Sequence, residues 1–212
     1  VIAVAFHPIN PDVVYIATQT AGVLASEDGG KTWSDRNQGL PAPWPSGACT
    51  CQDTRDILVD ENDSDIMYLA TAKQGLFRSS DAGMSWQLRA PQLEGESLRC
   101  LTQRQGALYA CVEGKGIWRS DDGGSSFMPL TQGNADLSNV TGIELDEATN
   151  DLYATTDAGL FRSTDGATFH APEGLCLPAR NLSEPVVVES QGERLLVFAT
   201  ESRGALAFPL SP

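Results

Sequence analysis

The chain has 212 residues, with 28 acidic residues against 14 lysines and arginines, and a net charge of −14 at pH 7. Hydrophobic residues make up 41% and charged residues 20%, which is the composition of a globular protein with its own core. The excess of acid and the lack of a basic run argue against nucleic acid and anionic membrane surfaces as partners. The apolar runs are too short to span a bilayer, so no membrane insertion is expected.

Three short segments recur five times along the chain. The first is predicted to form a strand over Ile2–Phe6, Ile57–Val59, Leu98–Thr102, Val140–Leu145 and Val186–Val188. The second covers Val14–Thr18, Met67–Thr71, Leu108–Cys111, Leu152–Thr155 and Leu196–Thr200. The third opens on glycine and covers Gly22–Ser26, Gly75–Ser79, Gly116–Ser120, Gly159–Ser163 and Gly204–Phe208. Their β-branched and aromatic residues, bounded by turn residues and without a helical period, predict an all-β chain.

A turn motif, here called the Asp turn, follows the third segment in the first four repeats. The four copies are Ser26–Trp33, Ser79–Trp86, Ser120–Phe127 and Ser163–Phe169, the last being one residue shorter. Its aspartate can accept hydrogen bonds from the backbone of its own loop, and its glycines allow positive φ. Its aromatic residue can bury a ring between neighbouring sheets. The motif therefore predicts a tight hairpin before a fourth strand.

These residues resemble the Asp-box, or BNR, repeats of β-propellers, over essentially the whole chain. Families with this box include sialidases, xyloglucan-type endoglucanases, sortilin-like receptors and a photosystem II assembly factor. The resemblance implies a single propeller domain over 1–212, with five blades of four antiparallel strands and a last blade that lacks its outer strand. The expected blades are 1–38, 54–91, 96–131, 138–172 and 184–212. Residues before Val1 could supply the missing strand, or the chain could be an excerpt of a longer propeller.

The resemblance also implies that the Asp turns are structural and remote from any chemistry. The residues concerned are Asp28, Trp33, Asp81, Trp86, Asp122, Phe127, Asp165 and Phe169. Three arginines, Arg78, Arg119 and Arg162, occupy equivalent positions in repeats two to four. They either form a patch for an acidic partner or make a repeated structural ion pair with a neighbouring blade.

Candidate binding residues fall on the face opposite to the Asp turns. The long loops Gln38–Asp56 and His170–Glu184 lie there, and Trp44 is either a stacking platform or a loop-packing residue. The loops between the second and third strands of the blades include Lys73 and Gln74. Together with the segments that lead into each blade, these loops are expected to converge on a polar rim around the central channel. The predicted binding residues are Trp44, Arg55, Lys73, Glu113, Lys115, Asp157, Glu201 and Arg203.

The pattern favours a non-enzymatic scaffold that recognises a protein partner through this loop-rich face. His7 and His170 are the only histidines and look unrelated, and no glycine-rich phosphate loop occurs. The alternative is a carbohydrate-active protein, either lectin-like or a glycoside hydrolase, with Glu113, Asp157 and Glu201 as candidate catalytic carboxylates. No cofactor is expected, although acid-rich loops could hold calcium.

Five cysteines leave at least one unpaired within a monomer. Cys100 and Cys111 fall on adjacent predicted strands of one hairpin. In this hairpin the residue numbers of two opposite partners add up to about 211, so the two cysteines are expected to face each other at a distance that permits a disulfide. The alternative, which the sequence slightly favours, is a pair of buried free thiols, since cysteine is a good small core residue. No export signal is visible in the chain, and an extracytoplasmic location, after removal of such a signal, is the expectation.

Overall fold

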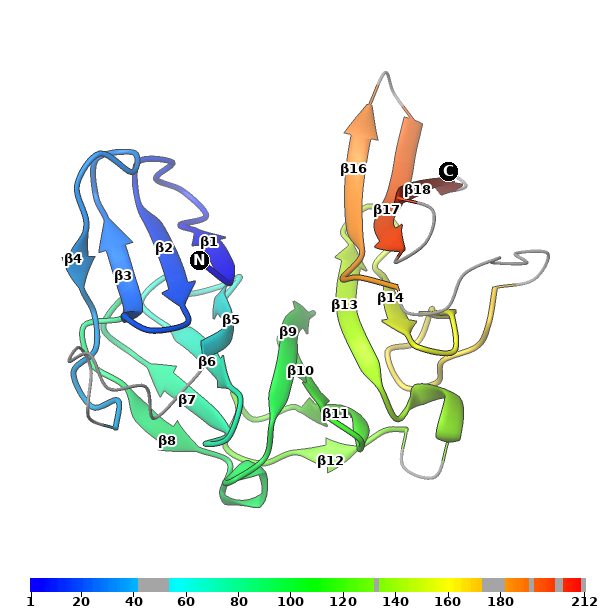
Figure 1. The fold of residues 1–212 in the computed structure, drawn as a ribbon, viewed down its shortest axis with the longest axis horizontal. Coiled ribbons are helices and arrows are strands. Elements are labelled where there is room, and N and C mark those ends of the chain that lie inside the picture. Colours follow the sequence, from blue (N-terminus) through cyan, green and yellow to red (C-terminus); the bar gives the residue numbers. More distant parts are fainter. Residues whose placement is uncertain (42–53, 132–133, 173–181, 191–192, 201–203, 211–212) are drawn as a thin grey trace. The chain divides into compact units, whose positions relative to one another are not determined.

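The computed structural model describes residues 1–41, 54–131, 134–172, 182–190, 193–200 and 204–210. Over these ranges, no helix is long and apolar enough to cross a membrane. Five sheets follow one another along the described chain, each with its strands in chain order (Figure 1). The residue contacts divide the chain into two compact units, one with Val1–Leu108 and Ser120–Phe127, the other with Tyr109–Arg119 and Met128–Pro212.

The strands lie where the repeats predict them. The first sheet contains β1 (Ala3–Phe6), β2 (Val14–Thr18), β3 (Gly22–Ser26) and β4 (Ser34–Asp35). The second contains β5 (Thr54–Val59), β6 (Met67–Thr71), β7 (Leu76–Ser79) and β8 (Gln87–Arg89). The third contains β9 (Leu98–Arg104), β10 (Ala107–Val112), β11 (Gly116–Ser120) and β12 (Met128–Pro129). Two short 3-10 segments, η1 (Pro91–Leu93) and η2 (Ala135–Leu137), were not expected from the sequence.

The last two sheets have three strands each among the described residues. They contain β13 (Val140–Asp146), β14 (Asp151–Thr156) and β15 (Leu160–Ser163), then β16 (Val186–Ser190), β17 (Glu193–Thr200) and β18 (Gly204–Leu210).

A full outer strand in the fourth repeat was predicted, and this is wrong. Only a single bridge between Arg162 and His170 forms there, with hydrogen bonds in both directions at 2.8 and 2.9 Å. The number of blades in a complete ring and the single-domain assignment stay predictions.

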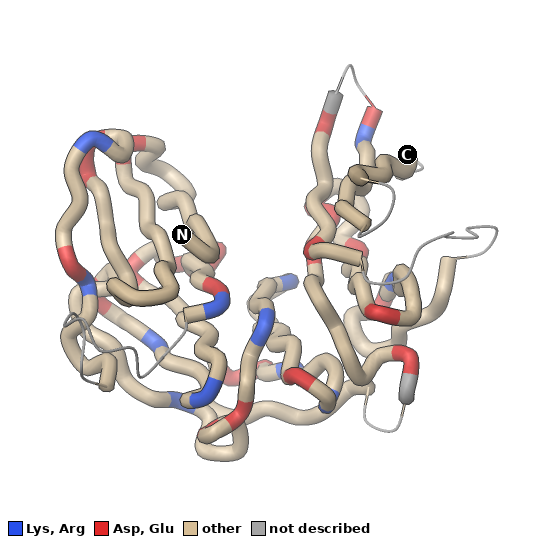
Figure 2. Tube along the Cα trace, viewed as in Figure 1, with Lys and Arg blue, Asp and Glu red and all other residues tan. Residues whose placement is uncertain are grey.

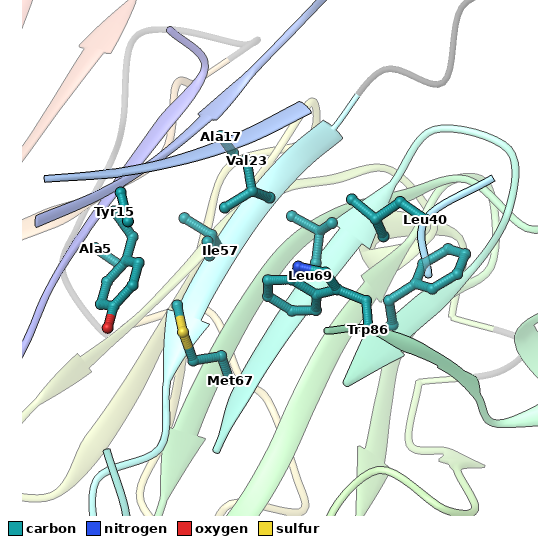
Figure 3. Packing of buried hydrophobic residues seen from close by; sticks show 11 residues of the cluster. Ala5, Tyr15, Ala17, Val23, Leu40, Ile57, Met67, Leu69 and Trp86 are labelled. Carbon is teal, nitrogen blue, oxygen red and sulfur yellow. The ribbon is translucent and has the colours of Figure 1, made fainter. Parts of the chain in front are cut away.

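The core of the first unit lies between the first two sheets. Small side chains of the first sheet, such as Ala17 and Val23, meet larger ones of the second, such as Met67 and Leu69 (Figure 3). Met67 and Leu69 are fully buried, and each contributes about 1.5–3 kcal/mol by leaving water. Trp86 closes one end of this core and is 2% exposed.

The second unit has a smaller core of its own. Tyr153, Leu160, Leu182, Leu196 and Phe198 are buried together there. The Phe198 ring stacks on Phe208, with ring centroids 5.5 Å apart. Along β18, exposed and half-buried side chains alternate, which follows from the two-residue period of a strand.

The aspartate of each Asp turn holds the turn together. Asp28 accepts hydrogen bonds from the backbone N–H groups of Lys31 and Thr32 at 2.9 and 2.8 Å, and from the Thr32 hydroxyl at 2.6 Å. Ser26 donates to the same carboxylate at 2.8 Å. The bonds from the hydroxyl and the N–H of Thr32 lower the pKa of Asp28 to about 2. Asp81, Asp122 and Asp165 accept the same set from their own turns.

A tyrosine of the preceding sheet packs on each later Asp turn. A Cβ on Gly124 would lie 3.2 Å from Cε1 of Tyr68, a tight contact, so glycine at this position lets the ring pack closely on the turn. In the fourth repeat, the Tyr109 hydroxyl donates to the carbonyl of Gly166 at 3.0 Å. Tyr15 lies beside Gly83 in the same way. The Asp turn thus links neighbouring sheets as well as neighbouring strands.

The two cysteines of the third sheet, Cys100 and Cys111, are both disulfide-bonded. Each is 1% exposed. The alternative of two free thiols is therefore wrong. Cys49, Cys51 and Cys176 lie outside the described residues.

Gly39→Ala should destabilise the protein more than Gly95→Ala. Both glycines have positive φ, at 85° and 80°, so alanine at either position should cost about 1–2 kcal/mol in backbone strain. A Cβ on Gly39 would also lie 2.1 Å from the carbonyl oxygen of Trp86, whereas a Cβ on Gly95 meets nothing within 4 Å. Urea unfolding should show a loss on the order of 3 kcal/mol or more for Gly39→Ala. Equal losses for the two variants would contradict the close approach at Gly39.

Candidate functional site

A groove of about 560 Å³ lies in the first unit and is here called the Lys73 groove. It is lined by Gly39, Pro41, Lys73, Gln74, Phe77, Leu88, Glu94 and Gly95. Pro41, Phe77 and Leu88 form an apolar floor, and Leu88 remains 43% exposed. This volume and this mixture of an apolar floor with a few polar groups are typical of small-ligand sites.

The turn between β6 and β7 places Lys73 and Gln74 at the groove. The Thr71 hydroxyl ends β6 by donating to the carbonyl of Gly75 at 2.8 Å, and it accepts the N–H of Gln74 at 3.0 Å. Thr18 makes the same bond to Gly22 in the first repeat, at 2.9 Å. A threonine followed four residues later by glycine is therefore the local signal for this turn.

The η1 segment supplies the other wall of the groove. It packs on Gly75, where a Cβ would lie 2.3 Å from the carbonyl oxygen of Leu93. The N–H of Gly75 donates to the carbonyl of Glu96 at 3.2 Å. These contacts fix Glu94 and Gly95 opposite the turn that carries Lys73.

The polar side chains of the Lys73 groove lack partners. The Oε1 atom of Gln74 is buried and makes no hydrogen bond. Lys73 is exposed, and within the described part of the chain neither its ammonium nor the Glu94 carboxylate forms an ion pair or a side-chain hydrogen bond. A ligand could contact Lys73 and Glu94 without first displacing a partner among the described residues, whereas the Oε1 atom of Gln74 is shielded from solvent.

The other predicted binding residues lie in different places. Arg55 is an exposed residue of β5, and Glu113 and Lys115 are exposed in the turn between β10 and β11. Asp157 follows β14, and its carboxylate accepts the Asn139 amide at 3.0 Å. Trp44, Glu201 and Arg203 lie outside the described residues. The convergence of these residues on one central rim stays a prediction.

Two of the repeated arginines make contacts within the second unit. Arg162 donates from Nε to Asp151 at 2.9 Å and lies 5.9 Å from the ring centre of Tyr153. Arg119 lies 5.7 Å from the ring centre of Tyr109 and donates to the carbonyl of Gly166 at 3.4 Å. Arg78 lies close enough to Tyr68 to lower its pKa, against the larger effect of burial that raises it. These contacts favour the structural interpretation of the arginines over a free acidic-partner patch.

A second hollow, in the second unit, contains a carboxyl group that sequence reasoning missed. It measures about 590 Å³ and is lined by Glu144, Leu145, Asp146, Glu147, Ala148, Val187, Glu189 and Arg194. Glu144 projects from β13 and accepts the N–H of Val187 from β16 at 3.5 Å. Burial raises its pKa to about 7, and the negative charges of Glu184 and Glu147 add to this. An acidic residue within the apolar stretch Val140–Leu145 was the available sequence signal.

Asp146, two residues further along β13, is held in its charged form. Burial alone would raise its pKa, but hydrogen bonds from Thr149 and Arg194 outweigh burial and lower it. Arg194 donates to both carboxylate oxygens at 2.5 Å, and Thr149 donates at 2.8 Å. Because Asp146 is only 1% exposed and its oxygens are occupied, it cannot serve as a nucleophile or base beside Glu144.

The distribution of charge bears on which ligands either site can take. Figure 2 shows acidic residues along the whole described chain, with lysines and arginines between them. Among the described residues, no group of three or more histidine, cysteine, aspartate or glutamate side chains is placed to hold a metal ion. The net charge of −14 disfavours strongly anionic ligands throughout.

The sequence comparisons relate the chain to one kind of enzyme. No family model matches it. A xyloglucanase from Paenibacillus sp is 26% identical over 218 residues, which cover 93% of this chain and 18% of that protein. The chain thus spans about a fifth of the length of this curated relative.

Solved structures show the fold. A GH74 xyloglucanase from Xanthomonas campestris matches with a TM-score of 0.72 and 18% identity, over 100% of this chain and 36% of that one. The extracellular domain of a putative hybrid two-component system from B. thetaiotaomicron matches with a TM-score of 0.72 and 20% identity, over 98% and 27%. YCF48 bound to D1 peptide matches with a TM-score of 0.61 and 15% identity, over 99% and 66%. The chain therefore has the β-propeller fold that these proteins share.

Replacing Glu144 by glutamine should remove a pH dependence of stability. A folded-state pKa near 7, above the ordinary value of 4.5, means that folding favours the protonated carboxyl. The contribution of Glu144 to the free energy of unfolding is therefore fully present below pH 4.5 and is lost as the pH rises through 7. With allowance for solvent screening, the loss amounts to about 1–2 kcal/mol.

Urea unfolding at pH 5 and pH 8 measures this effect. Glu144→Gln should equal the wild type at pH 5 and be more stable at pH 8. Glu147→Gln, an exposed neighbour, is the matched control and should follow the wild type except for a small charge effect. A wild-type pH dependence that persists in Glu144→Gln would contradict the assignment.

Proposed function

We propose that this chain is a carbohydrate-binding β-propeller and that its Asp turns are Asp-box repeats. The observation that carries the proposal is the 26% identity with a xyloglucanase over 93% of the chain. This supports the carbohydrate-active alternative over the protein scaffold that the sequence alone favoured. A β-linked glucan of the xyloglucan type is the first ligand to test, since the relative's name states that it acts on xyloglucan.

Binding, and not hydrolysis by this chain alone, is the activity proposed. A glycoside hydrolase needs two carboxyl groups about 5–10 Å apart on either side of the scissile bond. The described lining of the Lys73 groove contains one carboxylate, Glu94. The other hollow is lined by Glu144, Glu147 and Glu189 as well as by Asp146, which is engaged by Arg194 and Thr149. The reducing-end assay below decides whether any two of these carboxyl groups act as a pair. Should a longer protein contain this chain, a second carboxylate could come from elsewhere in it.

An extracytoplasmic location is part of the proposal. The disulfide state of Cys100 and Cys111 suits an oxidising compartment. The structural similarity to an extracellular domain supports the same location.

The chain should bind neutral β-glucan oligosaccharides and be stabilised by them. A ligand at ten times its dissociation constant adds about 1.4 kcal/mol to the stability of the folded state. For a chain of this size, the melting temperature should rise by about 3–6 °C. Thermal unfolding with xyloglucan oligosaccharides and cellohexaose, with and without calcium, measures the shift, and a reducing-end assay should detect no hydrolysis.

Maltohexaose, an α-linked glucan of the same composition as cellohexaose, is the control and should give no shift. A panel without any shift would contradict carbohydrate binding. It would favour the second candidate, a protein-binding propeller, which the similarity to YCF48 bound to a peptide supports. New reducing ends would contradict binding without hydrolysis.

A further inference from the structure

We infer that the Lys73 groove is the glycan site and that it selects a neutral, hydroxyl-rich ligand over a charged one. This inference rests on the proposed carbohydrate binding and adds its place and its chemistry. The first observation is the pair of oppositely charged side chains at the groove, Lys73 and Glu94, which form no ion pair or side-chain hydrogen bond among the described residues. The Oε1 atom of Gln74 is also unpartnered, but it is buried, so it can accept from a ligand only after the amide turns toward the groove.

The charges at the groove argue for a neutral ligand. Lys73 offers three donors and Glu94 offers acceptors. Sugar hydroxyls both donate and accept, so one neutral sugar can satisfy both side chains. An anionic ligand would be repelled by Glu94 and by the net charge of −14, and a cationic one by Lys73.

The floor of the groove suits the apolar face of a sugar ring. Pro41 and Leu88 present apolar surface between the polar groups, and Phe77, 4% exposed, supports them from below. Leu88 is a large apolar side chain left 43% exposed on β8, although β8 pairs with the buried strand β7. Contact with a ligand would remove this surface from water.

The groove is rigid on both sides, which favours binding. The Thr71 hydroxyl closes the turn that carries Lys73, and the close contact between Gly75 and Leu93 ties η1 to that turn. The backbone that carries the polar groups is therefore held in place before any ligand arrives, so less backbone conformational entropy is lost on binding.

Calorimetric titration of the full chain with cellohexaose and xyloglucan oligosaccharides tests the inference. Gln74→Ala, Lys73→Ala and Leu88→Ser should each weaken binding at least tenfold while the melting temperature without ligand stays the same. The matched controls are Lys31→Ala, an exposed lysine of the first Asp turn, and Met128→Ser, an exposed apolar residue of β12. Both should bind as the wild type does.

The outcomes separate this inference from the proposed function. Unchanged binding in all three groove variants would overturn the site while leaving carbohydrate binding intact. Tighter binding of oligogalacturonate or of chitosan oligomers than of cellohexaose would overturn the preference for a neutral ligand. No binding of any oligosaccharide by the wild type would overturn the proposed function and this inference together.

Discussion

The contact between a tyrosine and the glycine-rich turn of the following repeat is the constraint on which the rest of the fold depends. Tyr68 packs closely against Gly124, where a Cβ would lie 3.2 Å from the ring, and the positive φ of that glycine shapes the turn. The turn keeps that shape because Asp122 binds its N–H groups. Aspartate, glycine and the distant tyrosine thus act together, and the arrangement recurs from one sheet to the next.

A similar close approach forms the Lys73 groove. Gly75 lets η1 come near the turn after β6, and the space left beside that contact is the groove. Gly116 has the same role in the third repeat, where a Cβ would lie 2.7 Å from the carbonyl oxygen of Leu137 in η2. The residues that link one sheet to the next therefore also shape the groove that we propose as the glycan site.

Local patterns allowed the strands and Asp turns to be predicted, because their hydrogen bonds join residues only a few positions apart. Lys73 and Gln74 were predicted to be rim residues on the same basis, and both line the groove. Leu88 and Glu94 were not, since they reach the groove only when η1 packs on Gly75. The raised pKa of Glu144 also depends on a distant strand, β16, and on burial that no local pattern records. The fourth repeat has a single bridge in place of a full outer strand. Strand formation there depends on which residues pair across the sheet, and residue type alone does not show this.

The residue contacts place the third Asp turn, Ser120–Phe127, in the same unit as the first two sheets. The strands that directly precede and follow this turn in the chain belong to the other unit. The unit of packing in this protein is therefore not a single sheet. It consists of one sheet together with the Asp turn of the next repeat, and we call this unit the packing module. Trp33, whose turn has no preceding sheet in this sequence, is 40% exposed, whereas Trp86 is 2% exposed. Truncations or blade exchanges designed at sheet boundaries would cut through this module, and cuts placed just after an Asp turn would preserve it.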